Sequence, residues 1–484
     1  MNKRIAIGFL FLAAMILCTA CGQPAPDSSM PPASSAVSVG PISSATQVSS
    51  DASSVSSELD PNAMEYIDYY CEHDVNADLS VLNGETVKQL ATVSVRTYIL
   101  TESGRLFGCG FNQFRSLAQG TSQPVLGLVE IKLPEKIKLI CAGEQGAVAV
   151  GESNDIYFWG RCFDFTYGVL PYDGNEPVRV PFDKEVAAID MRFRRVLILT
   201  ADGEAYAFGE NYNLTETDEE DQTINGYDWS LENFLVPQKL EIPEKVTQLA
   251  ATIDSMFFLG ASGKCYTAFS PINTNYPTKA IKGNPYIKQI DFSQPVQSIG
   301  SGDETLFLVT KDGEVYAAGN NITLNMGIGT KEQSKNINPA YSETWVLKAF
   351  ERVPVPEKVI KVAKSAAVNR SCFLTENGKV YVAGENFLDW MLSGRPIPDK
   401  SSTYGETEYV SEPVVMQLPD PVTDLDGRGV TLWYRRMDGK IFVVGLNTYG
   451  NALGAVRPTP CDGPYIQREP VEVPLTFADD FTFQ

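Results

Sequence analysis

A short pattern of apolar and polar positions recurs seven times between residue 87 and the end of the chain. Each unit opens with an aliphatic residue, and a second aliphatic residue follows three positions later. Next come an apolar run such as 196–199, a polar turn, and another apolar run such as 205–208. Apolar runs of this length, bounded by turn residues, predict β-strands rather than helices. The seven openers are Val87, Ile137, Val186, Val246, Val296, Val359 and Val422.

The turn in each unit carries a second set of repeated positions. Four units have Asp-Gly or Asn-Gly there, and the other three have Ser-Gly or Ser-Asn. These dipeptides favour a hairpin of type I′, which needs positive φ at both central residues. Glycine stands six positions after the turn in every unit but one. An aromatic residue stands three positions after every turn, at Phe107, Tyr157, Tyr206, Tyr266, Tyr316, Tyr381 and Phe442.

The number and length of the units predict an all-β fold, a seven-bladed β-propeller. An extended segment precedes each later opener, which makes four strands per unit, and residues 87–484 divide into seven units of about 57 residues. A solenoid or a sandwich would also repeat strands, but seven units with this turn chemistry favour a closed ring. The segment Val471–Leu475 has no unit after it. We therefore expect this C-terminal strand to complete the first blade and close the ring.

The N-terminus predicts export. Lys3 and Arg4 precede an apolar run and then small residues, which is the order of a secretory signal. The stretch before Cys21 resembles the lipobox of bacterial lipoproteins, so we expect Cys21 to carry a lipid, with a plain cleaved signal as the alternative. Residues 22–60 contain 13 serines and no Lys or Arg, which is typical of a flexible tether. The expected organisation is a signal at 1–20, a lipid-anchored tether at 21–60, a junction at 61–86 and the propeller at 87–484.

Charge and composition exclude several functions. The formal net charge of -21 opposes binding to nucleic acid, and the lipid anchor would be the only attachment to the membrane. The chain has one histidine, His73, in the junction, so hydrolases with a catalytic histidine and zinc sites rich in imidazole are disfavoured. The acidic run at 216–221 lacks the spacing of a calcium loop. We therefore expect no cofactor and no metal.

Cysteines leave the question of disulfides open. After export and lipidation an odd number would remain, so at least one would be unpaired within the chain. Cys109 and Cys265 fall on predicted blade strands, where buried thiols are common. The seven cysteines are Cys71, Cys109, Cys141, Cys162, Cys265, Cys372 and Cys461.

The units resemble the repeat of the regulator of chromosome condensation family. The family pattern of Asp-Gly, an aromatic residue, Gly, Asn and Gly-x-Leu-Gly is clearest at residues 438–454. The resemblance covers residues 87–484 and implies a seven-bladed propeller. The eukaryotic founder exchanges nucleotide on a small GTPase and docks on chromatin, but no residue here matches either activity. The resemblance to secreted bacterial members, including inhibitors of β-lactamases, implies protein binding on one face of the ring.

Aromatic residues gather in the three longest connections, which all enter after the strand that contains the repeated aromatic residue and glycine. Such connections should project from one rim, where aromatic side chains can bind a partner or stack on sugars. Packing of these rings against their own loops is the competing interpretation. The candidate residues are Tyr212, Tyr227, Trp229, Tyr341, Trp345, Phe387, Trp390, Tyr404 and Tyr409.

The sequence therefore favours a monomeric, noncatalytic lipoprotein on the extracytoplasmic face of a bacterial membrane. Its rim would bind a protein or a cell-wall glycan. The alternative from the enzyme class is a carbohydrate-active enzyme that uses a pair of carboxylates such as Asp303 and Glu304. No catalytic residue is assigned.

Overall fold

The computed structural model describes the propeller region with gaps and leaves the N-terminal segment outside. The described residues are 78–112, 114–160, 176–192, 195–209, 223–224, 227–228, 235–253, 255–268, 276–302, 304–329, 346–347, 349–363, 370–386, 409–419, 421–447, 450–453 and 466–484. All of them belong to the compact unit Tyr70–Gln484. The expected signal, the expected tether, most of the junction and Cys21, the expected lipidation site, lie outside these ranges.

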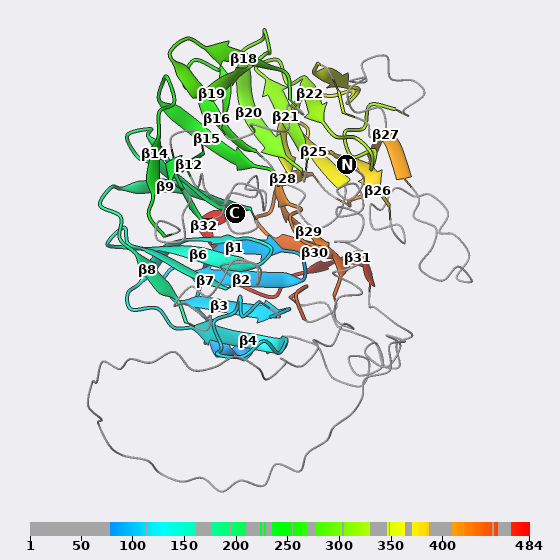
Figure 1. The fold of residues 1–484 in the computed structure, drawn as a ribbon. Helices are drawn as coiled ribbons and strands as arrows, with labels where there is room; N and C mark the ends of the chain where they lie inside the picture. The colour runs from blue at the N-terminus through cyan, green and yellow to red at the C-terminus, as the bar shows by residue number, and fades with distance from the viewer. Residues whose placement is uncertain are drawn as a thin grey trace, which may run out of the picture. The chain divides into compact units, whose positions relative to one another are not determined.

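Seven sheets of four or five strands follow one another along the chain, which confirms the predicted seven-bladed propeller (Figure 1). Blade one contains β1 (Val87–Val93), β2 (Arg96–Thr101), β3 (Leu106–Gly110) and β4 (Val125–Ile131). Blade two contains β5 (Ile137–Ala142), β6 (Gly146–Gly151), β7 (Ile156–Gly160) and β8 (Val178–Val180). Blade three contains β9 (Val186–Arg192), β10 (Arg195–Thr200), β11 (Ala205–Gly209) and β14 (Gln238–Leu240).

Blade four carries one extra outer strand, and the remaining blades repeat the same order. Blades four and five contain β15 (Val246–Ala251), β16 (Met256–Gly260), β17 (Cys265–Ala268), β18 (Thr278–Ile281) and β19 (Asn284–Ile290), then β20 (Val296–Ser301), β21 (Thr305–Thr310), β22 (Val315–Gly319) and β23 (Glu351–Val353). Blades six and seven contain β24 (Val359–Ala363), β25 (Arg370–Thr375), β26 (Val380–Glu385) and β27 (Tyr409–Val415), then β28 (Val422–Asp426), β29 (Thr431–Arg436), β30 (Ile441–Leu446) and β31 (Ile466–Glu472).

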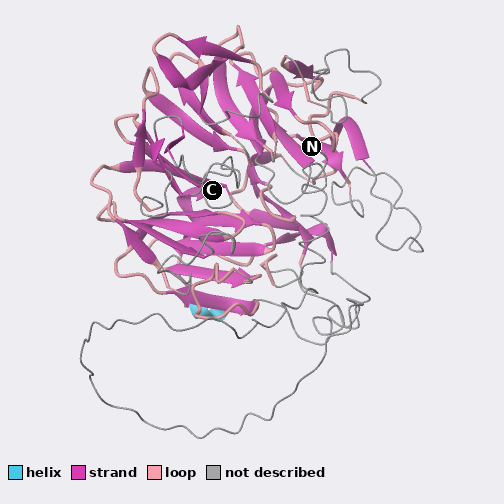
Figure 2. Cartoon of the chain, viewed as in Figure 1, coloured by secondary structure: helices cyan, strands magenta, loops and turns pink. Residues whose placement is uncertain are grey.

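Three short elements lie outside this repeat. A single 3-10 helix, η1 (Leu79–Leu82), precedes the first blade and packs against β4. The strands β12 (Thr223–Ile224) and β13 (Tyr227–Asp228) form a two-stranded sheet of their own. Figure 2 shows that strands dominate the described part of the chain and that η1 is a minor element there. Among the described residues no helix is both long and apolar enough to span a bilayer.

The core lies between the blades. Every residue of β10 is buried, because this second strand of blade three is covered by a neighbouring blade on each side. The part of the ring that the structure describes has seven clusters of buried apolar side chains, one at each junction between neighbouring blades. A single blade would leave these side chains in water, so each blade needs both neighbours.

The repeated turns join one blade to the next. The carbonyl oxygen of Gly313 accepts a hydrogen bond from the N–H of Val359, the opener of the following blade, at 2.9 Å. Gly104, Gly203, Gly263 and Gly378 accept from their following openers in the same way. Gly313 has a φ of +80°, and a Cβ there would lie 2.7 Å from the Cβ of Lys358. Glycine is therefore needed for both the backbone conformation and the close approach of the next blade.

The expected turn type is wrong. Each turn has one residue with positive φ, a glycine in six blades and Asn154 in the second, whereas type I′ needs positive φ at two successive residues. The Gly104 N–H donates to the carbonyl of Thr101, which places glycine at the end of a turn of ordinary hand. This geometry corresponds to a three-residue hairpin loop closed by a left-handed glycine. In the second blade Asn154 takes that position with a φ of 73°, and its side-chain oxygen accepts from the Val186 N–H at 3.1 Å.

The aromatic position of the repeat has a polar partner that the sequence pattern did not reveal. The hydroxyl groups of Tyr157, Tyr266 and Tyr381 donate to Glu135, Glu244 and Glu357, each two residues before the opener of the same blade. The tyrosine rings are almost wholly buried, and the glutamate supplies a hydrogen-bond acceptor at the blade edge. The sequence signal that could have predicted this hydrogen bond is the glutamate two residues before the opener.

The end of the chain differs from the expected closing strand. Val471 and Glu472 lie in β31, which is the outer strand of blade seven and pairs with β30. The strand that joins the first blade is β32 (Phe477–Phe483), which pairs in parallel with β1. It is a fifth strand at the inner edge, since the first blade already contains β1 to β4. A C-terminal strand does join the first blade, as predicted, but the predicted segment belongs to its neighbour.

Glu244 tests the contribution of these tyrosine–glutamate pairs to stability. Its carboxylate accepts from the Ser262 N–H at 2.7 Å and from the Tyr266 hydroxyl at 2.7 Å. Burial opposes ionisation, but these hydrogen bonds lower the pKa of Glu244 below its usual value. The Glu244→Gln variant should lose about 1 kcal/mol of unfolding free energy at pH 7.

The pH dependence of this loss follows from the sign of the shift. A carboxyl whose folded pKa is lowered stabilises fully above the unfolded pKa of about 4.3 and loses that effect as pH falls through the folded pKa. Urea denaturation should therefore show wild type and Glu244→Gln converging below about pH 4. The control is Glu152→Gln on an exposed turn residue. An equal gap at pH 7 and pH 3 would contradict the ionic explanation.

Candidate functional site

Strand direction assigns the connections of every blade to one of two faces. Because the four strands of a blade alternate in direction, the turn after the first strand and the connection after the third strand lie at the same end. We call this the long-connection face. The opposite end, the turn face, carries the glycine turns and the short links between blades. The segments Gly209–Gln238, Gly319–Glu351 and Glu385–Tyr409 all bridge third and fourth strands.

Most of the candidate aromatic residues cannot be placed. Tyr227 begins β13, in the two-stranded sheet of the third blade's long connection. The residues that lie outside the described ranges are Tyr212, Trp229, Tyr341, Trp345, Phe387, Trp390 and Tyr404. The assignment of these residues to a binding surface stays a prediction.

Tyr409 is the candidate whose side chain the structure describes. It begins β27 opposite Glu385 in β26, at the long-connection face of blade six. The side chain is half-buried, and burial together with the negative charge of Glu385 raises the pKa of Tyr409. Part of this side chain is therefore buried and part is exposed.

Asparagines anchor the long-connection face over three blades. In blades one, five and seven an asparagine stands two residues after the glycine at or next to the end of the third strand. Its side-chain oxygen accepts a backbone N–H five residues later, as Asn112 does from Leu117 at 2.8 Å and Asn321 from Met326 at 2.9 Å. Asn447 accepts from Ala452 at 3.2 Å. The bond turns the chain inward, so Leu117 and Met326 join the buried clusters.

The centre of the ring near this face is held by a buried ion pair. Arg428, after the first strand of blade seven, donates to the carboxylate of Asp190 in blade three and to the carbonyl of Ala142 in blade two, at 3.3 Å for Ala142. Blades one and two separate blade seven from blade three, so the Arg428–Asp190 pair spans the axis. Both side chains are less than 5% exposed. Burial alone would lower the pKa of Arg428, but the charge of Asp190 raises it.

Further charged side chains complete this network, which we call the hub. Asp426 accepts from the Thr92 hydroxyl at 2.6 Å, and burial raises the pKa of this carboxyl. Arg192 pairs with Glu144 at 2.7 Å. Arg96 donates to the carbonyl oxygens of Gly143 and Glu144 at 2.8 and 2.5 Å. Hydrogen bonds and ion pairs therefore link blades one, two, three and seven across the middle of the ring.

The hub is suited to holding blades together rather than to chemistry on a substrate. Asp190, Asp426 and Glu144 are 2%, 5% and 3% exposed, so a bound polysaccharide cannot reach their oxygens. Glu304, from the candidate carboxylate pair, accepts from the Asn320 amide at 2.7 Å, and Asp303 lies outside the described ranges. No group of three metal-ligating side chains that could hold an ion occurs within the described residues.

The described cysteines are buried thiols. Cys109, Cys141, Cys265 and Cys372 all lie within blade strands. Burial raises the pKa of Cys109 and of Cys265 to about 12, which keeps both protonated and unreactive at neutral pH. The prediction of buried thiols at these two positions is confirmed.

Sequence comparison finds eukaryotic relatives, and no family model matches the chain. The chain is 23% identical to the ultraviolet-B receptor UVR8 of Arabidopsis thaliana over 58% of this chain and 68% of that protein. It is 24% identical to the regulator of chromosome condensation of Homo sapiens over 38% of this chain and 41% of that protein. The mouse regulator matches at 27% identity over 30% of this chain and 33% of its own length. These two matches span less than half of the regulators.

Solved structures share the architecture at low sequence identity. Yeast RCC1 (Prp20), solved with Kap60 bound, has a TM-score of 0.57 at 17% identity, covering 83% of this chain and 87% of that chain. Prp20p of Saccharomyces cerevisiae, reported with its binding to Gsp1p and histones, has a TM-score of 0.57 at 18% identity and covers 77% and 87%. At this identity the likeness shows the fold alone.

A double-mutant cycle tests the hub. Asp190→Leu leaves Arg428 buried without its ion partner, and Arg428→Met does the reverse, so each should lower the unfolding free energy by about 3–5 kcal/mol. The double variant should lose clearly less than the sum, because it removes both charges together. Urea denaturation at neutral pH measures all four proteins. Additive losses would show that the two side chains do not stabilise one another.

Proposed function

We propose that this seven-bladed propeller, which is similar to RCC1 proteins, is a noncatalytic module that binds a protein partner on its long-connection face. The supporting observation is the asymmetry of the ring. Links between blades on the turn face are short, as from Leu240 to Val246, and are tied down by the glycine hydrogen bonds. The three longest connections bridge third and fourth strands, and the strand ends that they join lie at the opposite face.

The solved relatives favour a protein as the ligand. Yeast RCC1 was solved with Kap60 bound, and Prp20p was studied for binding to Gsp1p and histones. Both structures concern the same yeast protein, which shares this fold and binds other proteins. We extend only this property to the present chain, and neither Gsp1p nor histones are proposed as its partner. A cell-wall glycan is the alternative ligand for the same aromatic connections.

Three tryptophans in the long connections give the direct test. The full-length chain would be tagged and crosslinked in its native cells, as wild type and as the Trp229→Ala, Trp345→Ala and Trp390→Ala triple variant. Large aromatic residues supply much of the energy of protein interfaces, so the variant should recover its partner at least tenfold less. Ring stability, followed by thermal unfolding, should change little.

A matched variant on the turn face controls for general surface effects. Ile360 and Met437 are 43% and 74% exposed there, so Ile360→Ala, Met437→Ala and Lys311→Ala should leave recovery unchanged. Equal recovery by wild type and the tryptophan variant would overturn the assignment of the face. If the wild-type ring retains isolated wall polysaccharide and recovers no protein, the ligand is the glycan. Turnover of polysaccharide, abolished by one Asp or Glu change, would replace the binding module with an enzyme.

We further propose that the ring is held on the extracytoplasmic face of a bacterial membrane by a lipid on Cys21. The charged n-region, the apolar run and the small residues before Cys21 support this location. Wild type should incorporate labelled fatty acid and sediment with membranes, and Cys21→Ser should appear in the soluble exported fraction. Unlabelled, soluble wild type would indicate a plain cleaved signal instead.

A further inference from the structure

The last strand occupies a place that no other described strand of the ring has. β32 pairs only with β1, on the side away from β2, so its other edge has no strand partner. The pairing is parallel and its register shifts between Val87 and Gln89. Parallel pairs are slightly less stable per residue than antiparallel ones. β32 is therefore an added inner strand of the first blade, outside the four-strand pattern of the repeat.

Hydrogen bonds hold the two ends of β32. At its start the Val87 N–H donates to the carbonyl of Thr476 at 2.8 Å. At its end the Gln484 N–H donates to the carbonyl of Leu90 at 2.9 Å, and the Gln484 side-chain amide donates to the carbonyl of Ile189 at 2.6 Å. Ile189 lies in blade three, so the last residue of the chain bridges two blades. These contacts specify the position of the strand along β1.

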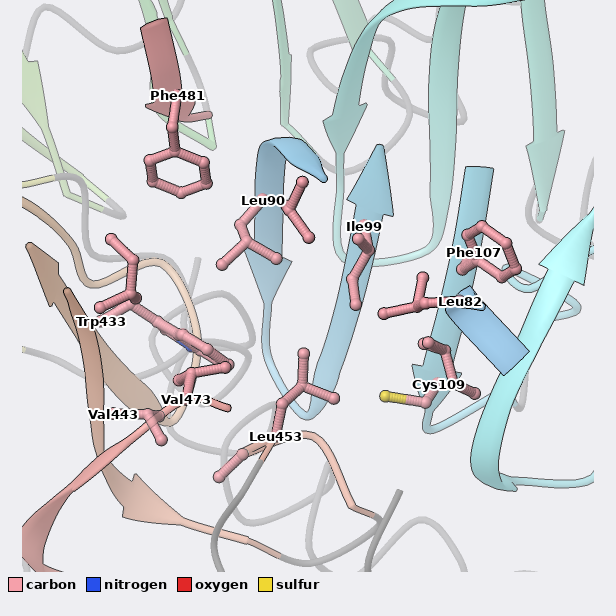
Figure 3. Packing of buried hydrophobic residues seen from close by; sticks show 14 residues of the cluster. Leu82, Leu90, Ile99, Phe107, Cys109, Trp433, Val443, Leu453, Val473 and Phe481 are labelled. Atoms are coloured by element: carbon pink, nitrogen blue, oxygen red, sulfur yellow. The ribbon is translucent and has the colours of Figure 1, made fainter. Parts of the chain in front are cut away.

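Apolar side chains specify which face of β32 meets the ring. Phe481 is 5% exposed and belongs to the cluster that includes Leu90 and Trp433 (Figure 3). The rings of Phe477 and Phe483 each lie 5.0 Å from that of Phe481 in edge-on contacts. Asp479 and Asp480 between them are exposed. The strand thus offers one buried aromatic anchor, two supporting rings and two exposed carboxylates.

The first and seventh blades meet through other contacts as well. The Thr97 hydroxyl donates to the carbonyl of Asn451 at 2.7 Å, and the Val430 N–H donates to the carbonyl of Ser94 at 2.8 Å. Trp433, Val443 and Leu453 pack into the same junction (Figure 3). The junction therefore keeps polar and apolar contacts that do not involve β32.

From these contacts we infer that the inner edge of β1 is a binding site for an extended peptide, whose ligand is the chain's own C-terminal segment, residues 476–484. The ring forms the site, and the covalent connection supplies the ligand at high effective concentration. Phe481 is the anchor of this ligand, and Gln484 fixes its register. The segment should consequently bind the ring when it is no longer covalently attached.

Cleavage after folding tests this site. A protease recognition sequence would be inserted between Leu475 and Thr476 of the full-length chain, cut in the folded protein, and challenged with excess labelled peptide of residues 476–484. We expect the labelled peptide to displace the cleaved strand and to bind saturably, as followed by fluorescence anisotropy. The cut ring should melt lower after dialysis and recover its Tm when the peptide is added.

Two variant peptides distinguish a site from general stickiness. Phe481→Asp should bind at least tenfold more weakly, because it places a charge in the buried cluster, and Asp480→Asn on the exposed side should bind like the natural sequence. Three results would overturn the inference. They are unfolding of the ring on cleavage, a folded cut ring that takes up no peptide, and equal binding of the Phe481→Asp peptide.

Discussion

The hydrogen bond from each opener N–H to the carbonyl of the preceding turn glycine is the contact that sets one blade against the next. It is observed at five junctions, and at a sixth Asn154 supplies a side-chain oxygen in place of the glycine carbonyl. The second strand of a blade is covered only when both neighbours are present, so these bonds act at the places where the apolar clusters form. The hydrogen bond from a turn to the next opener and the burial of apolar side chains between the same two blades therefore stabilise the same junction.

This contact separates the two faces of the ring. On the turn face the turn glycines bond to the next blade, and Glu135, Glu244 and Glu357 accept hydrogen bonds from tyrosines of their own blades. At the long-connection face the structure describes the buried hub and the anchored asparagines, and the links from one blade to the next lie at the opposite face. Binding residues are often found on loops that a rigid scaffold positions. The paired, buried charges of the hub serve the scaffold itself.

Local features of the sequence were sufficient for the blade pattern. The opener Val246, the turn at Ser262 and the aromatic Tyr266 lie within one unit, and their spacing follows from strands of fixed rise and a turn of fixed length. The turn type was predicted wrongly, because Asp-Gly is compatible with two hairpin geometries and the choice depends on the glycine contacting the next blade. The role of Tyr266 was missed for a similar reason. Its partner Glu244 precedes the strand, and only the folded blade brings the two together.

By itself the sequence determined the number of blades, their strand order and the phase at which long connections enter, because these are set by periodicity within short stretches. Only the tertiary structure decided how the ring is filled at its centre. Arg428 and Asp190 are 238 residues apart in the sequence, and neither lies in a motif that predicts the other as its partner. Likewise, β31 and β32 are neighbouring apolar segments, and which one joins the first blade depends on the space left inside β1. Contacts across the axis depend on closure of the whole ring, which no local pattern encodes.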